Sequence, residues 1–258
     1  MFYTGYPEKV WGIKTNKLTA EWAPKRIKIT QENEPFFQKQ FTAVSKYGTG
    51  NFYNRIEKSF KKLNGKIYFN KKVTNIIASN KKIKSIIFNN DKKLQINNHE
   101  VIISTLPITF TSFLLGYKSK LKFNGIRSVY VSVKKKRVLP KKVNWLYFAD
   151  PNIIFNRVSE ASTMTKTIVA KDKTYLTCEI TFSKNDKIDK MGFKDLSEKV
   201  VNDLIDVGLI SDKKDIDKIA DNKENHVYPV QFTNYRSELA RTRQQMKNMI
   251  KYIHWNWW

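Results

Sequence analysis

The sequence predicts an α+β fold, in which a mixed sheet with a hairpin and a largely antiparallel sheet are accompanied by flanking helices. One amphipathic helical pattern is followed by four short β-branched runs, and longer alternating runs fill much of the second half of the chain. The 258 residues are 41% hydrophobic and 13% aromatic, which is enough apolar material for one large domain or two ordinary ones.

The stretch "YPEKVWG", residues 6–12, places two rings, a proline, an acid and a base within seven positions. Gly12 closes the stretch and frees the backbone to turn. Charge flanked by flat rings is typical of a loop that grips a sugar or a nucleotide, whereas a loop that packs Trp11 into the core is the structural alternative. The residues themselves leave both interpretations open.

Residues 51–63, "NFYNRIEKSFKKL", predict an amphipathic helix that ends at Asn64 and Gly65. Gly48 and Gly50 precede it in the turn "KYGTGN". A glycine-rich turn before a helix can bring backbone N–H groups close to a ligand, and a plain helix entry is equally consistent with the pattern.

Four strands are predicted between residues 66 and 107, in the runs "KIYFNKKVTNIIAS", "KIKSIIF", "KLQIN" and "EVIISTLP", with a hairpin tip at 89–93. The continuous apolar run "VIIST" predicts a strand that is buried on both faces. It ends at Ser104, Thr105 and Pro107, and ligands often collect at such strand ends. A short helix is predicted next, in "ITFTSFLLG".

Beyond residue 118, longer strands are predicted in "SVYVSVKKKRV", "VNWLYFAD", "IIFNRV", "TIVAK" and "TYLTCEITF", and they can pair as an antiparallel sheet. A helix over residues 193–210, a strand in "HVYPVQF" and a helix over residues 235–253 complete the predicted elements.

The formal charge of +25 raises nucleic acid or an anionic membrane as a partner. Only eight of the 48 basic residues are Arg, however, and the lysines are spread along the whole chain. The run 134–137 has the character of a charged strand end. We therefore expect no specific nucleic-acid partner.

The single cysteine, Cys178, lies in an alternating strand pattern and cannot form an internal disulfide, which favours a reducing compartment. No apolar run reaches transmembrane length and no signal peptide is apparent, so a cytoplasmic location is expected. His99, His226 and His254 are isolated from other potential ligands, and no metal site is predicted.

Seven segments occur in a recognisable order: "YPEKVWG", "EWAPKRI", "KYGTGNFYNRIEKSFKKLNGKIYFNKKVTNI", "VIISTLPI", "WLYFAD", "NRVSE" and "YPV". In this order the chain resembles the FAD-dependent oxidoreductases of the amine oxidase and protoporphyrinogen oxidase group, especially bacterial members related to UDP-galactopyranose mutase. The resemblance extends to about Tyr252.

The resemblance implies a two-domain flavoprotein fold with FAD as cofactor. Residues 1–45 and 119–232 would belong to the substrate domain, 46–118 to an incomplete FAD-binding domain, and 233–258 to a carboxy-terminal helix and an atypical tail. The residues implied to approach the cofactor are Gly48, Gly50, Val73, Ser104, Thr105 and Pro107. The residues implied to line the substrate cavity are Tyr6, Lys9, Trp11, Arg26, Tyr147, Asn156, Arg157 and Tyr228.

Several of these substrate residues have structural alternatives. Arg157 follows a strand and is well placed to hold an anionic group through two hydrogen bonds, or else to form an ion pair with Glu160. Arg26 can instead lie on a surface helix, and the hydroxyls of Tyr147 and Tyr228 can be tethered in the core. No catalytic residue is predicted, because a flavin carries the redox chemistry itself.

The sequence also departs from the pattern of these enzymes. It contains neither the strand, GxGxxG and helix that hold the FAD diphosphate nor a second glycine-rich segment after the last strands. We therefore expect a truncated chain without tight flavin binding of its own, related to enzymes for FAD-linked oxidation or for a redox-neutral flavin reaction on a small, anionic or sugar-nucleotide substrate. The alternative is a non-enzymatic basic protein that binds a partner chain or a polyanion such as nucleic acid or an anionic membrane.

Overall fold

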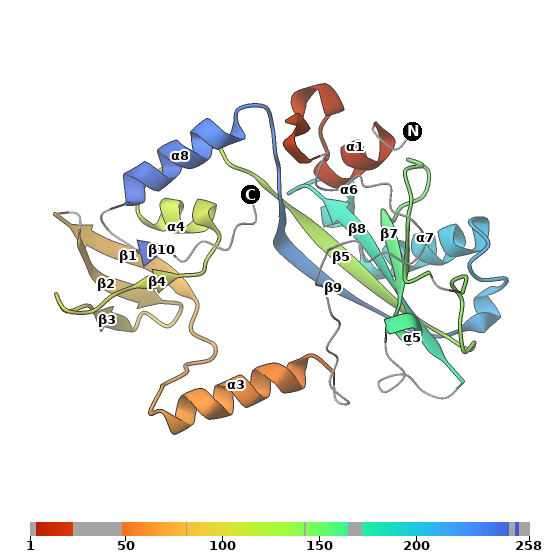
Figure 1. Ribbon diagram of the computed structural model, residues 1–258, viewed down its shortest axis with the longest axis horizontal. Helices are drawn as coiled ribbons and strands as arrows, with labels where there is room; N and C mark the ends of the chain where they lie inside the picture. Colours follow the sequence, from red (N-terminus) through yellow and green to blue (C-terminus); the bar gives the residue numbers. More distant parts are fainter. Residues whose placement is uncertain are drawn as a thin grey trace. The chain divides into compact units, whose positions relative to one another are not determined.

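The computed structural model describes residues 4–22, 48–80, 82–141, 143–164, 172–247 and 251–252. The chain divides into two compact units, and each is described by itself (Figure 1). The first unit comprises residues 1–59 and 123–228, and the second comprises residues 60–122 and 229–258. The assignment of ranges to a substrate domain and a flavin domain stays a prediction.

A five-stranded sheet forms the centre of the first unit, in the order β6-β7-β8-β5-β9. Strands β6 to β7, β7 to β8 and β8 to β5 all pair antiparallel, as predicted. The strands are β5 (Phe123–Val133), β6 (Trp145–Tyr147), β7 (Arg157–Glu160), β8 (Thr174–Phe182) and β9 (Ile216–Pro229).

One face of this sheet carries the hydrophobic core. Strict alternation along β8 buries one set of its side chains, and Cys178 is fully buried between Val129 of β5 and Val158 of β7. Helix α7 (Phe193–Asp206) contributes Leu196, Val200 and Leu204 to the same cluster. Because the cysteine lies in this apolar layer, burial raises the pKa of its thiol.

Helix α1 (Gly5–Trp11) contains most of the stretch "YPEKVWG", which is therefore a helix with a turn rather than a loop. The backbone of Gly12 adopts the left-handed conformation at φ 65°, and its N–H donates to the carbonyl oxygen of Glu8 at 2.8 Å. This confirms the turn predicted at Gly12. The remaining short helices of this unit are η1 (Thr15–Lys17), η2 (Ala20–Trp22), α5 (Ala161–Met164), α6 (Lys187–Lys190) and η3 (Lys213–Asp215).

Helix α3 (Gly50–Lys62) confirms the predicted amphipathic helix, and the boundary between the two units falls within it. Asn64 follows it with a positive φ of 62°, as expected for a helix that ends at "NG". The apolar side chains at helical spacing are exposed to solvent, from 46% for Phe60 to 81% for Leu63. None of the residues of α3 is buried.

The second unit contains a three-stranded antiparallel sheet of β1 (Val73–Ser79), β2 (Lys82–Phe88) and β3 (Lys93–Gln95). The turn between β2 and β3 lies at the predicted hairpin tip, where Asp91 has a φ of 57°. Strand β2 coincides with the predicted run "KIKSIIF".

The prediction of a strand buried on both faces in "VIIST" is wrong. Strand β4 is only two residues long (Ile103–Ser104) and pairs parallel with β10 (Lys251–Tyr252). Val101 is 58% exposed and Ile103 is 54% exposed. A continuous apolar run indicates burial only where other elements cover both sides, and among the described residues so short a ladder does not supply that cover.

Two helices complete the second unit. Helix α4 (Ile108–Leu114) packs against α8 (Tyr235–Met246) through a small apolar cluster. Helix α8 is shorter than the predicted helix because residues 251–252 form a strand. The strand predicted in "TIVAK" lies outside the described residues. Within the described ranges, no helix has the length and apolar character needed to cross a membrane.

Candidate functional site

A row of polar side chains crosses the sheet on the face opposite the core. Tyr147 of β6 lies opposite Arg157 of β7, and Arg157 lies opposite Glu179 of β8. Residues that pair directly across strands share a face, and their neighbours Val158 and Cys178 point into the core. This second face is therefore polar, yet its side chains are only partly exposed, at 33% for Arg157 and 14% for Glu179.

Arg157 and Glu179 form an ion pair in this row. Burial disfavours the charged guanidinium, but the hydrogen bond and the charge of Glu179, together with the hydroxyl of Tyr147, outweigh it and raise the pKa of Arg157. The alternative interpretation of an ion pair is thus realised with Glu179 and not with Glu160. The carboxylate of Glu160 instead accepts hydrogen bonds from the backbone N–H groups of Val138 and Leu139, at 2.9 and 2.7 Å.

Two further tyrosines lie close to Arg157. The rings of Tyr6 and Tyr147 meet edge to face, with their centroids 5.1 Å apart. Burial raises the pKa of Tyr6, and the nearby hydroxyls of Tyr147 and Tyr228 raise it further, whereas the charge of Arg157 opposes them. The structure therefore brings together four of the predicted substrate residues, from α1, β6, β7 and β9.

Asn156 precedes β7 and is 1% exposed. Its side-chain oxygen accepts hydrogen bonds from the backbone N–H of Thr181 at 3.1 Å and from the Thr181 hydroxyl at 3.3 Å. These bonds fix the start of β7 against β8. Asn156 thereby positions the neighbouring Arg157.

Three buried polar atoms of this region have no hydrogen-bond partner among the described residues: Asn156 Nδ2, Arg157 Nε and Glu179 Oε2. A buried polar group without a partner costs roughly 1–3 kcal/mol. Such atoms concentrate at neighbouring positions of one sheet face. All three atoms are shielded from solvent, so this cost falls on the fold itself.

Lys9 has a different environment from the one predicted. Its ammonium group donates to three backbone carbonyl oxygens, at 3.2 Å for Phe148, 3.0 Å for Asp150 and 2.7 Å for Phe155. Burial lowers the pKa of Lys9 to about 8. Because a lysine has three donors and all are engaged here, the geometry favours a structural role that ties α1 to the segment before β7.

The other predicted substrate residues are less informative. Trp11 is half-buried at the end of α1. Arg26 lies outside the described residues. Their contact with a substrate stays a prediction.

The predicted cofactor residues are divided between the two units. Gly48 precedes α3 and Gly50 begins it, in the first unit. In the second unit Val73 begins β1, Ser104 ends β4, and Thr105 and Pro107 follow β4. The described structure gives no relative position for the two groups, and the cofactor role of all six residues stays a prediction.

The predicted cofactor residues make local contacts among the described residues. A side chain added at Gly48 or Gly50 would meet nothing within 4 Å, so neither glycine is needed for a close approach among the described atoms. The N–H groups of Asn51 and Phe52 already donate to Gly48 and Thr49, and the Ser104 hydroxyl lies 3.2 Å from that of Thr111.

Glu179 is the site residue that sequence reasoning missed. The run "TYLTCEITF" contained the signal, because Glu179 is its only charged side chain and lies in the middle of a strand. A charge in the centre of a sheet needs a partner of opposite sign. The alternation around Cys178 also places Glu179 on the face away from the core.

No protein-family model matches the chain, and no curated protein matches it. Among solved structures, the chain is similar to reduced UDP-galactopyranose mutase, with a TM-score of 0.74 and 18% sequence identity. The match covers 96% of this chain and 57% of that chain. The chain has the fold of part of UDP-galactopyranose mutase. The predicted α+β fold is therefore confirmed.

Two further structures show the same relationship. A proposed protoporphyrinogen oxidase from Exiguobacterium sp. 255-15 matches with a TM-score of 0.61 and 13% identity, over 80% of this chain and 46% of that chain. An oxidoreductase from Methanosarcina mazei matches with a TM-score of 0.60 and 16% identity, over 89% of this chain and 54% of that chain. The chain thus spans about half the length of the mutase and of these two proteins.

Proposed function

We propose that this chain is the substrate-binding portion of a flavin-dependent oxidoreductase or of a mutase of the kind named above. In this proposal Tyr6, Tyr147, Arg157 and Tyr228 bind a small anionic substrate, such as a sugar nucleotide. The observation that carries the proposal is the convergence of these four side chains on one polar, half-buried sheet face.

The chemistry of the four side chains suits such a ligand. A guanidinium group can bind a phosphate or carboxylate through two parallel hydrogen bonds, and the side chain of Arg157 is 33% exposed. Aromatic rings can pack against a sugar or a base, and the tyrosine hydroxyls add polar contacts. A bound flavin would supply the redox chemistry.

Calorimetric titration of the purified chain with UDP-galactose tests the proposal. We expect saturable binding that weakens about fivefold in Arg157→Lys, which keeps the charge beside Glu179 but loses the forked donor. Tyr147→Phe removes one hydroxyl and should also weaken binding. Tyr68→Phe removes an exposed hydroxyl in the second unit, and it should leave affinity unchanged. Absence of binding up to about 1 mM, or equal losses in all three variants, would contradict the proposal.

A second candidate function is binding of a partner chain or a polyanion without catalysis. The exposed apolar side chains of α3, among them Phe52, Ile56 and Phe60, favour it, as does the charge of +25. DNA binding that falls steeply with salt would support the polyanion form. Binding of UDP-galactose through Arg157 would favour the first function.

A further inference from the structure

A groove of about 830 Å³ lies in the second unit, between α4, α8 and the segment that leads into β5. This volume is in the range of pockets that bind small molecules. The lining residues used in the argument are Phe113, Tyr117, Lys118, Lys120 and Arg241. All of them belong to the second unit.

The lining combines positive charge with aromatic rings. Lys118, Lys120 and Arg241 supply three cationic groups, of which Arg241 is paired with Glu238 behind the described lining. Phe113 is 71% exposed, an unusually high value for a large apolar side chain. A ring that carries negative charge would be complementary to this surface, because it can stack on an aromatic face while its anionic end meets the cations.

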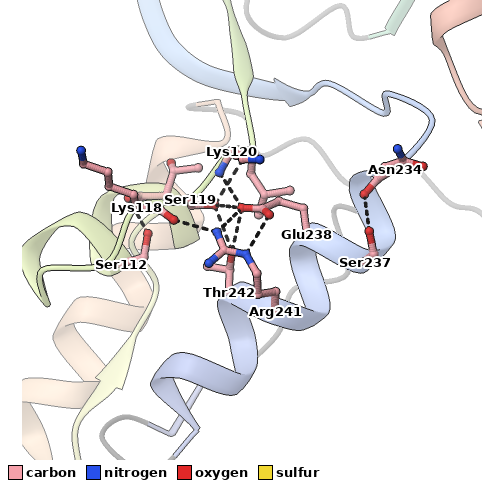
Figure 2. A network of polar contacts seen from close by, with 11 residues as sticks. Ser112, Lys118, Ser119, Lys120, Asn234, Ser237, Glu238, Arg241 and Thr242 are labelled. Atoms are coloured by element: carbon pink, nitrogen blue, oxygen red, sulfur yellow. Dashed lines mark hydrogen bonds and ion pairs between the residues drawn. The ribbon is translucent and has the colours of Figure 1, made fainter.

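Glu238 of α8 holds the cationic side of the groove in place (Figure 2). Its carboxylate accepts two hydrogen bonds from Arg241, at 2.9 and 2.8 Å, and one from the backbone N–H of Lys120 at 2.5 Å. Arg241 also donates to the carbonyl oxygen of Lys118 at 2.8 Å. The network ties the segment 118–120 to α8, so the backbone that carries both lysines is fixed before any ligand arrives.

We propose that this groove binds a nucleoside diphosphate or a closely similar aromatic phosphate. The base packs on Phe113, and the phosphate oxygens contact Lys118, Lys120 and the outer edge of Arg241. The site is separate from the Tyr6–Arg157 cluster, which belongs to the first unit, and the inference does not depend on the proposed function.

Calorimetric titration of the full chain with ADP and with pyrophosphate tests the inference. We expect saturable ADP binding that weakens at least tenfold in the double variant Lys118→Glu/Lys120→Glu. The control is Lys92→Glu/Lys93→Glu at the β2–β3 hairpin, which makes the same change in charge and should leave the affinity within about twofold. ADP should bind at least fivefold more tightly than pyrophosphate, and Phe113→Ala should remove that advantage.

Three outcomes would overturn the inference. One is the lack of saturable ADP binding up to about 1 mM. Another is an equal loss in the control double variant, since binding would then depend on total charge alone. The third is a short oligo-dT strand that binds through Lys118 and Lys120 more tightly than ADP, because the groove would then take single-stranded nucleic acid. Tyr147→Phe should not change ADP affinity, which separates this test from that of the first unit.

Discussion

Arg157 and Glu179 lie directly opposite each other on β7 and β8 and form an ion pair on the sheet face that does not carry the core. The pair connects the fold to the candidate site. It keeps a guanidinium group on a half-buried surface, next to the ring of Tyr147. A charge in that position is tolerated because its partner lies on the adjacent strand.

Loss of one member of this pair should destabilise the fold. We expect Arg157→Met to lower the free energy of unfolding by about 3 kcal/mol, because the carboxylate of Glu179 would keep its partial burial without a counter-charge. A double-mutant cycle with Glu179→Met, followed by urea unfolding, should give a coupling energy above roughly 1 kcal/mol. The exposed pair Lys14–Glu8 serves as control and should couple by less than about 0.5 kcal/mol. A coupling energy near zero for Arg157 and Glu179 would contradict this account.

Lys9→Met should destabilise the first unit by roughly 3 kcal/mol, since three carbonyl oxygens lose their donor at once. Lys14→Met, at a side chain that is 76% exposed, should change stability by less than about 0.5 kcal/mol. Denaturant unfolding of both variants measures the difference. If Lys9→Met were as stable as Lys14→Met, the inference that Lys9 has a structural role would be wrong.

Two glycines should respond to alanine in opposite directions. At Gly125 of β5 an added Cβ would lie 2.2 Å from the Phe182 ring and 2.5 Å from the carbonyl oxygen of Glu224, so Gly125→Ala should cost more than about 2 kcal/mol. At Gly50 the added Cβ meets nothing within 4 Å and helix α3 gains a better helix former. Gly50→Ala should be neutral or raise the thermal midpoint slightly. A neutral Gly125→Ala would show that β5 and its neighbours lie further apart.

The stability that Glu238 contributes should depend on pH. The hydrogen bonds from Arg241 lower the pKa of Glu238 to about 2, against an ordinary value of 4.5. As pH falls, the Glu238 carboxylate is protonated in the unfolded chain before it is protonated in the folded chain. Its contribution to the free energy of unfolding is therefore complete above about pH 4.5 and is lost as pH falls through about 2. Wild type should therefore exceed Glu238→Gln in unfolding free energy at pH 6, and the two should converge towards pH 2. Glu224→Gln, at an exposed position of β9, is the control.

FAD should bind the isolated chain weakly. The sequence has no GxGxxG segment, whose backbone N–H groups bind the diphosphate in dinucleotide-binding folds. A fluorescence titration should therefore show no saturation below about 100 μM. A dissociation constant in the micromolar range or below would refute this prediction.

The strands and helices with clear periodicity could be predicted from the sequence. The alternation in "TYLTCEITF" defines β8, and the spacing in "NFYNRIEKSFKKL" defines α3 within one residue at either end. Strand β9 was foreseen only in its last residues, because positions 216–225 are rich in Asp, Lys and Asn and carry no apolar alternation. The pairing of β9 with β5 is a tertiary effect that no local pattern records.

The candidate site could be predicted only in part for a similar reason. The family resemblance indicates Tyr147, Arg157 and Tyr228, and the sequence also places Arg157 after a predicted strand. The register that aligns Arg157 with Glu179, however, is set by strand pairing. The three carbonyl oxygens around Lys9 come from residues 148, 150 and 155, which are distant in sequence. The position of a charged residue can be read from the sequence, but the group that pairs with it can be identified only from the fold.

The two edge strands of the five-stranded sheet differ in length and in charge, and both features bear on aggregation at high protein concentration. Strand β6 has only three residues, and β9 exposes Lys218, Lys223 and Glu224 along its length. A short edge strand and a charged edge strand both disfavour pairing with a strand from another molecule. The sheet is thus protected against fibrillar growth at its two margins by different means, brevity at one and electrostatic repulsion at the other.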